Sequence, residues 1–347
     1  MLKRKKLPDS LSAALENGDF DAFCRIMKRC DPNARTDTGY NAFTLPHLTE
    51  AHIRWLIEYG TIINQPARWG DTPLTFVSAL DGRHETIRLL IRFGASVHIG
   101  APLHSAARHG RTENMRVLME NGAELEAHNS FGQTPLEYAL ASVAGAGILD
   151  IADAVGLLLD SGAILTDRAR AEFTRLAESV EFYRDRFPED IEPKVDAALS
   201  RLHSLFSTAP LPHRILHDGV SLICVPDGAW QDQYDALWNL LVPASGPCKT
   251  VQGEMIRIVG KISHELLDNG GGNWDSDFER MLAWLEQRLT SSNALTESEK
   301  EEASRRIRAL LRRSIQEEDH YKLCRLAVKW VLNTPNPLPL KQTNYCR

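Results

Sequence analysis

The stretch APLHSAARHGRTENMRVLMENGAELEAHN, residues 101–129, decides the fold of the first half of the chain. Pro-Leu opens a helix of small residues, and a His-Gly-Arg break separates it from a second helical segment. Ala106 and Ala107 allow the two helices to approach closely. Gly122 follows the second segment, where glycine suits the left-handed turn that ends a helix. The stretch therefore predicts a pair of short, closely packed helices.

The same pattern recurs on both sides of this stretch. It is present in GDTPLTFVSALDGRHETIRLLIRFGASVH, residues 70–98, and in GQTPLEYALASVAGAGILDIADAVGLLLDSGAIL, residues 132–165. Thr72 and Thr134 can cap the first helix of each copy, and the proline that follows lies where a missing N–H costs nothing. Together these ordered features resemble the ankyrin repeat, whose Thr-Pro-Leu-His-x-Ala pattern recurs at about 33 residues.

Two earlier copies keep less of the pattern. SLSAALENGDFDAFCRIMKRCDPNART, from Ser10, lacks the Pro-Leu start and is predicted to be an N-terminal cap with a more polar outer face. TGYNAFTLPHLTEAHIRWLIEYGTIINQ, from Thr38, keeps a good second helix but has a shortened first one. The resemblance therefore implies about five repeats, covering residues 9–166, with the first two degenerate.

The spacing between copies is uneven. Pro73 and Pro102 are 29 residues apart, whereas Pro102 and Pro135 are 33 apart. The missing residues fall after His98, so we expect the β-turn finger at that point to be short. The insertion SVAGAGILD predicts a longer connection between the two helices of the last repeat.

The remainder of the chain is predicted to be mainly α-helical. DRARAEFTRLAESVEFYRDRF and DIEPKVDAALSRLHSLF read as amphipathic helices that cap the open end of the solenoid. Asp218-Gly219, between two apolar segments, predicts a short β-hairpin. The later sequence resembles uncharacterised bacterial helical domains, which implies a bacterial origin but carries no named activity. The predicted divisions are a basic tail at 1–8, the repeats at 9–166, capping helices at 167–207, a helical domain at 208–335 and a tail at 336–347.

The helix predicted from Val251 onward has one apolar face and one charged face. Its charged face carries carboxylates and cations at i,i+3 and i,i+4 spacing, a pattern typical of a solvent-exposed surface. A partner-binding role is the alternative. The charged residues are Glu254, Arg257, Lys261 and Glu265.

HELLDNGGGNWDSDFERML, residues 264–282, raises the question of a bound ion or phosphate. A calcium loop counted from Asp268 would place glycines at two ligand positions, and a phosphate loop would need a lysine that is absent. Gly270 instead suits the end of one helix, while Ser276 and Glu279 form a capping box for the next. We therefore predict a corner between helices, with no metal and no cofactor.

Composition narrows the class of protein. The 347 residues carry 40 Lys and Arg against 46 Asp and Glu, a net charge of −6, so no basic field favours nucleic acid. No apolar run reaches the roughly 18 residues of a membrane helix. Six scattered cysteines read as reduced thiols, which predicts a cytoplasmic location. No nucleophile motif or metal-ligand spacing is present, so the chain is predicted not to be an enzyme.

The resemblance implies that the concave face and the fingers bind another protein. A bacterial immunity or antitoxin-like inhibitor of a toxin or effector is the sharpest version. The alternatives are an adaptor, a host-directed effector, or a C-terminal enzyme domain that the repeats direct to its substrate. The partner and the oligomeric state stay open. The predicted partner-binding residues are Arg35, Asp37, Arg68, Trp69, Phe76, Arg108, His128, Asn129, Phe131 and Tyr138.

Overall fold

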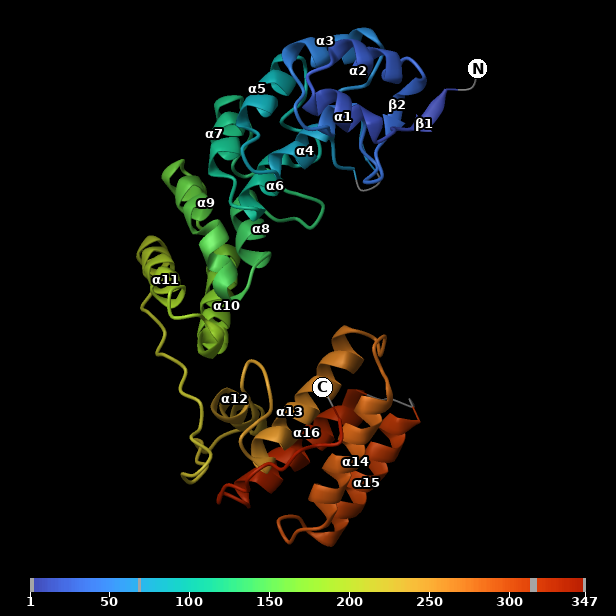
Figure 1. Cartoon of the computed structure of the whole chain (residues 1–347). Coiled ribbons are helices and arrows are strands. Elements are labelled where there is room, and N and C mark those ends of the chain that lie inside the picture. The colour runs from blue at the N-terminus through green and yellow to red at the C-terminus, as the bar shows by residue number, and fades with distance from the viewer. Residues whose placement is uncertain (1–2, 68–69, 313–316, 346–347) are drawn as a thin grey trace. The chain divides into compact units, whose positions relative to one another are not determined.

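The computed structural model describes residues 3–67, 70–312 and 317–345. It divides into two compact units, each with its own apolar core. Unit 1 comprises residues 1–183 and 187–211, and unit 2 comprises residues 184–186 and 212–347. Both units are built mainly from helices, which confirms the predicted fold class (Figure 1).

In unit 1 each predicted repeat forms a pair of helices. In the second repeat the first helix is reduced to a single 3₁₀ turn, as its shortened sequence predicted. The pairs are α1 Ser10–Glu16 with α2 Phe20–Met27, η1 Ala42–Thr44 with α3 Glu50–Glu58, α4 Pro73–Ser78 with α5 His84–Arg92, α6 Pro102–Arg108 with α7 Thr112–Glu120, and α8 Pro135–Ala141 with α9 Ile148–Asp160. The turn η2, Gly145–Gly147, lies in the longer connection before α9.

The first helices begin as the threonines predicted. The Thr72 hydroxyl accepts a hydrogen bond from the Thr75 N–H, and Thr134 accepts one from Glu137 in the same way. α6 is the exception, because Ala101 stands at its N-cap with a left-handed φ of 59°. This conformation costs a non-glycine residue about 1–2 kcal/mol.

Two further helices extend the stack. α10 Asp167–Tyr183 packs against α8, and α11 Glu192–Phe206 packs against α9. Phe173, Leu176 and Val180 of α10 are fully buried in the same core as the repeats. α10 and α11 therefore cover apolar surface that the last repeat would otherwise expose.

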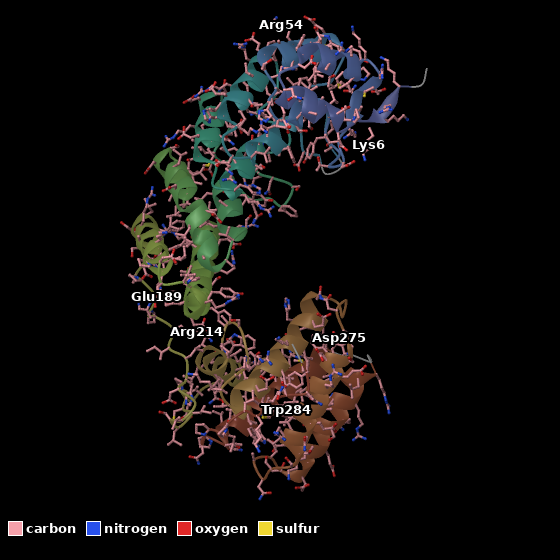
Figure 2. The ribbon with its side chains drawn as sticks, in the orientation of Figure 1. Lys6, Arg54, Glu189, Arg214, Asp275 and Trp284 are labelled. Carbon is pink, nitrogen blue, oxygen red and sulfur yellow. The ribbon has the colours of Figure 1, made fainter. Side chains whose placement is uncertain are left out.

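The basic N-terminus differs from the predicted tail. Residues Arg4–Lys6 form strand β1, which pairs in parallel with β2, Cys30–Arg35. The Leu7 N–H donates to the Arg35 carbonyl at 2.8 Å, and the Leu7 side chain is buried. The basic side chains still point into solvent, as Lys6 shows in Figure 2. Backbone pairing with β2 and the burial of Leu7 thus hold residues 4–7 against the rest of unit 1, although the basic composition of this segment predicted a tail.

Unit 2 is a bundle around one central helix, α13. α13 contacts α12, α14 and α16, while α15 packs between α14 and α16. The core of the bundle is filled with apolar side chains. Its elements are η3 Arg184–Arg186, α12 Trp230–Leu241, α13 Val251–Ser263, the π-helical turn η4 His264–Asp268, α14 Ser276–Thr290, α15 Glu297–Leu311 and α16 Glu317–Leu332.

The charged face predicted to be solvent-exposed on α13 is instead largely buried. Glu254 is fully buried, Arg257 is 9% exposed and Glu265 is 4% exposed. The Arg257 guanidinium donates to both carboxylate oxygens of Glu254, at 2.8 and 2.6 Å. The prediction was wrong because neighbouring elements surround α13, and the two buried charges are tolerated because they pair with each other.

The predicted C-terminal tail also packs into unit 2. The Val251 N–H donates to the Leu338 carbonyl at 2.7 Å. Further along, the Tyr345 hydroxyl donates to Glu254 at 2.7 Å, and the Tyr345 side chain is only 5% exposed. Residues 334–345 therefore complete the polar cluster of Glu254, Arg257 and Tyr345, which we call the buried polar cluster.

The predicted hairpin at Asp218-Gly219 is not formed, since residues 207–229 contain no strand. The Asp218 carboxylate accepts from the backbone N–H groups of Val220 and Ser221, both at 2.8 Å, which makes a local turn. The segments on either side of this turn form hydrogen bonds with other parts of unit 2. The His217 N–H donates to the Leu240 carbonyl, and the Ile223 N–H donates to the Pro335 carbonyl. These two segments therefore form backbone hydrogen bonds with other segments and not with each other, as they would in a hairpin.

The three-glycine stretch forms a corner between helices. Gly270 and Gly271 take left-handed φ values of 59° and 74°. The Glu265 carboxylate accepts from the Asn273 N–H at 2.5 Å and from the Asn269 side chain at 3.0 Å. A buried carboxylate from the preceding helix thus holds the shape of the corner.

The next helix begins one residue earlier than the capping box predicted. Asp275, rather than Ser276, is the N-cap, and its carboxylate accepts from the N–H groups of Asp277 and Phe278. Carboxylates cap helices as well as hydroxyls do, so the neighbouring aspartate competes for the same position. Trp274 stacks on Phe278 with ring centroids 5.1 Å apart.

Gly110→Ala tests how closely repeats pack in unit 1. A Cβ at Gly110 would overlap the Asp150 carbonyl, and the backbone there is left-handed with φ +66°. We expect the free energy of unfolding to fall by about 3 kcal/mol, measured by chemical denaturation followed by circular dichroism. Gly122→Ala is the control, because its φ is also positive but its Cβ would meet nothing within 4 Å. Equal losses in the two variants would contradict the close approach.

Tyr345→Phe tests whether the C-terminal segment stabilises unit 2. Removing the hydroxyl takes one hydrogen-bond donor from the buried Glu254 carboxylate, which should cost about 1–3 kcal/mol of unfolding free energy. Lys341→Ala, at an exposed position of the same segment, should change stability by less than about 0.5 kcal/mol. A Tyr345→Phe protein as stable as the Lys341→Ala protein would mean that the segment does not support the cluster.

Candidate functional site

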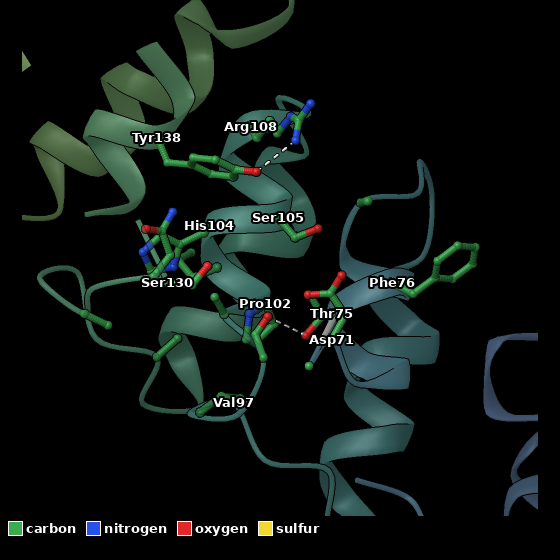
Figure 3. A pocket seen from close by; sticks show the side chains of 18 of the residues that line it. Asp71, Thr75, Phe76, Val97, Pro102, His104, Ser105, Arg108, Ser130 and Tyr138 are labelled. Carbon is green, nitrogen blue, oxygen red and sulfur yellow. Dashed lines mark hydrogen bonds between the residues drawn. The ribbon is translucent and has the colours of Figure 1, made fainter. Parts of the chain in front are cut away.

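Unit 1 contains a groove of about 1180 Å³ among the loops that join successive repeats. The loop between α5 and α6, residues 93–101, is shorter than those at 59–72 and 121–134 on either side. All three loops contribute to the lining, together with α4, α6 and α8 (Figure 3). The short middle loop contributes Val97, His98, Gly100 and Ala101 to this lining.

The middle loop is held close to its neighbour by Gly100. A Cβ at Gly100 would lie 2.6 Å from the Thr75 hydroxyl and 2.9 Å from the Thr72 N–H nitrogen, closer than a real Cβ approaches. The Thr75 hydroxyl also donates to the Gly100 carbonyl at 2.9 Å. Glycine is therefore required at this point of the groove wall.

One wall of the groove is aromatic and carries a carboxylate. The rings of Tyr40 and Phe76 lie 4.6 Å apart. The Tyr40 hydroxyl donates to the Asp71 carboxylate at 3.3 Å. Partial burial raises the pKa of Asp71 above its ordinary value, and burial beside that carboxylate raises the pKa of Tyr40 to about 12.

The opposite wall carries an arginine fixed by a tyrosine. The Arg108 guanidinium donates to the Tyr138 hydroxyl at 2.8 Å and lies 5.5 Å from the centre of the Tyr138 ring. Arg108 is exposed, and Ser105 lies one turn earlier on the same helix (Figure 3). The cation is thus presented to the groove in a defined orientation.

His104, beneath this wall, has a structural role. Its Nε2 atom lies 2.9 Å from the Gln133 carbonyl, so the imidazole ties α6 to the start of the next repeat. Burial lowers the pKa of His104, which keeps the ring neutral near pH 7. It therefore adds no positive charge to the groove.

The groove brings together six of the predicted partner-binding residues. Phe131 stands out because it is 72% exposed at the tip of its loop. The Asn129 carboxamide oxygen accepts from the N–H groups of Phe131 and Gln133 and so shapes that tip. The six residues are Phe76, Arg108, His128, Asn129, Phe131 and Tyr138.

Arg35 and Asp37, two of the remaining predicted residues, are not among the described residues that line the groove. Arg35 donates to the carbonyls of Gly39 and Pro66, which ties two loops together. Asp37 forms an exposed ion pair with Lys6 at 2.5 Å. Arg68 and Trp69 lie outside the described residues.

Sequence reasoning missed the acidic wall. Tyr40 and Asp71 occupy the same position in two successive repeats, directly after Gly39 and Gly70 at the loop ends. That shared position was the available signal, because it lies where each loop turns into the next helix. Ser105, which is not among the predicted partner-binding residues, also lines the groove.

Unit 2 holds a buried group of side chains of types that also occur in catalysis. The Ser263 hydroxyl lies 2.7 Å from Nε2 of His320, and the Cys324 sulfur lies 3.6 Å from the same nitrogen. Burial raises the pKa of Cys324 to about 12, so the thiol stays protonated near neutral pH. A neutral, buried thiol is a poor nucleophile, and this arrangement is better explained as packing.

In the part of the chain that the structure describes, groups of three or more His, Cys, Asp or Glu side chains arranged to hold a metal ion are absent. Over the same residues, the helices fall short of the length and apolar character needed to cross a membrane.

Comparison with known proteins points to one repeat family. The sequence model described as "Ankyrin repeats (many copies)" matches residues 89–139, which include α6, α7 and the loop that carries Phe131. Protein phosphatase 1 regulatory subunit 12A of Mus musculus is 37% identical over 84 residues, which is 23% of this chain and 8% of that protein. The chain thus matches only a small part of that relative.

Two further relatives match over similarly short segments. A Rickettsia bellii protein described as an ankyrin repeat protein is 50% identical over 46 residues, 13% of this chain and 19% of that protein. Human cyclin-dependent kinase inhibitor 2A is 29% identical over 93 residues, 25% of this chain and 58% of that protein. The paired helices, the capping threonines and these matches agree that the chain contains ankyrin repeats, which indicate a role in protein–protein interaction.

Proposed function

We propose that the chain is a non-catalytic binding protein that holds a protein partner in the groove of unit 1. The observation that carries the proposal is the set of side chains that the groove presents. Aromatic residues and arginine are the types that dominate binding energy at protein interfaces. Phe76, Tyr138, Phe131 and Arg108 supply both types within one concave surface.

The groove is also well suited to binding because its walls are rigid. Phe76 and Tyr138 project from α4 and α8, whose inner faces belong to the continuous core of unit 1. A surface that is ordered before binding loses less conformational entropy when the partner arrives. The exposed Phe131 then offers a large apolar contact at the rim.

A regulatory role is consistent with the names of two relatives, a phosphatase regulatory subunit and a cyclin-dependent kinase inhibitor. We extend this to the present chain as an inhibitor that acts by covering its partner, of which a bacterial immunity or antitoxin-like protein is the narrowest form. In this proposal unit 2 has a structural or docking role. The filled core of unit 2 and its protonated Cys324 thiol favour that assignment over an enzyme domain.

The combined Phe76→Ala/Phe131→Ala variant tests the groove. Losing two aromatic contacts of about 1–2 kcal/mol each should weaken partner binding by about 30-fold or more. The measurement is capture of partners from a lysate of the source cells by full-length tagged protein, quantified by mass spectrometry. Ile164→Ala is the matched control, because Ile164 is 61% exposed and does not line the groove.

A second variant separates the groove from unit 2. Val220 and Leu222 of unit 2 are 82% and 59% exposed, and replacing both with aspartate should leave capture unchanged. A partner that survives the groove substitutions but is lost with the Val220→Asp/Leu222→Asp protein would place the binding surface in unit 2 and end the proposal.

A further inference from the structure

We infer that the groove recognises a partner segment in which a carboxylate side chain is flanked by apolar residues, and that Arg108 binds the carboxylate. The inference rests on the proposed function, because it names the chemistry of the partner that the same groove holds. It follows from the hydrogen-bonding state of Arg108, from the charge of the two walls and from the apolar rim.

Arg108 has hydrogen-bond donors that are not used by any described residue. A guanidinium carries five N–H donors, and the Tyr138 hydroxyl takes one of them. Across the described residues, Arg108 has no carboxylate within 4.0 Å. The tyrosine fixes the direction of the guanidinium, and its free edge can form the paired hydrogen bonds that carboxylates favour.

Arg111, the other arginine in the lining, is already engaged. Its Nε donates to the Ala79 carbonyl at 3.1 Å, and its guanidinium lies 3.9 Å from the Asp81 carboxylate. Arg111 therefore ties α7 to the preceding repeat. Arg108 alone of these two arginines is oriented but not paired with an acid.

Ser105 adds a second donor beside Arg108. The two residues are three positions apart on α6, so they share one face of the helix, and both line the groove. The Ser105 side chain is half-buried, and its hydroxyl has no hydrogen-bond partner among the described residues. A carboxylate held by Arg108 can accept from this hydroxyl as well.

Asp71 sets the orientation of the bound segment. Its carboxylate stands on the wall opposite Arg108, so it repels an acidic side chain placed on that side. An acidic residue of the partner is thereby directed to Arg108. Phe76 and Phe131, which also line the groove, offer apolar contacts to the neighbours of that acidic residue.

Peptide selection on the full-length protein tests the inference. Random dodecapeptides displayed on phage are selected for binding, and the enriched sequences are synthesised with a fluorescent label for anisotropy titration. We expect an aspartate or glutamate next to apolar residues in the enriched set. Arg108→Ala should weaken these peptides at least 10-fold, since a charge-assisted, paired hydrogen bond is lost.

A thermodynamic cycle separates recognition from indirect effects. Changing the peptide acid to its amide should weaken binding to the native protein by the same factor and leave binding to the Arg108→Ala protein unchanged. Arg108→Lys, which keeps the charge but not the fork of donors, should recover only part of the affinity. Arg116→Ala, an exposed arginine on α7 that pairs with Glu113, should bind as the native protein does.

The possible results test separately the role of Arg108 and the proposed function of the groove. Peptides that lose affinity with Phe76→Ala/Phe131→Ala but bind the Arg108→Ala protein normally would overturn the role of Arg108 and leave the groove as the binding site. Peptides indifferent to all of these substitutions, or a selection that enriches none, would count against both.

Discussion

Unit 1 depends on side chains of one repeat that satisfy backbone carbonyls of its neighbour. The Asn114 carboxamide donates to the carbonyls of Ser78 and Leu80, which the end of α4 would otherwise leave open. Arg175 does the same for Leu140 and Val143 at the end of α8. Buried carbonyls without partners are costly, so each helix pair needs the next one to be stable. These hydrogen bonds between neighbouring helix pairs also keep the groove rigid.

Unit 2 also depends on buried hydrogen bonds, but there they satisfy charged side chains instead of backbone carbonyls. Its central helix is surrounded on all sides, so the charged residues of that helix must find partners inside the protein. The buried polar cluster provides them: Glu254 pairs with Arg257 and accepts from Tyr345, which arrives from the far end of the chain. A helix with a charged face can thus lie at the centre of unit 2 because the C-terminal segment supplies a hydrogen-bond donor, the Tyr345 hydroxyl, to Glu254.

Much of the fold could be predicted from the sequence because the repeats are local. Thr134, Pro135 and Gly122 act on their own helix, and their effects are the same wherever the helix lies. The burial of Glu254 and the docking of the C-terminal segment could not be predicted, because they depend on contacts between residues about 90 positions apart. An i,i+3 pair has the same sequence pattern whether it is exposed or buried.

The residues that line the groove divide in the same way. Phe131 and Arg108 were predictable, since the repeat pattern alone assigns residues to loop tips and to the inner face. The shared repeat position of Tyr40 and Asp71 could have drawn attention to both residues, but the hydrogen bond between them could not be predicted, because it depends on how two successive loops pack against each other.

The short loop at residues 93–101 has a consequence for how such proteins diversify. A change of a few residues in a surface loop alters the closure entropy by well under 1 kcal/mol, so the helix stack tolerates it. Residues of this loop line the groove, so the same change alters the shape of the groove. Related chains can therefore acquire different partners by insertions and deletions between repeats, a larger step than point substitution, while the packing that keeps them folded is left untouched.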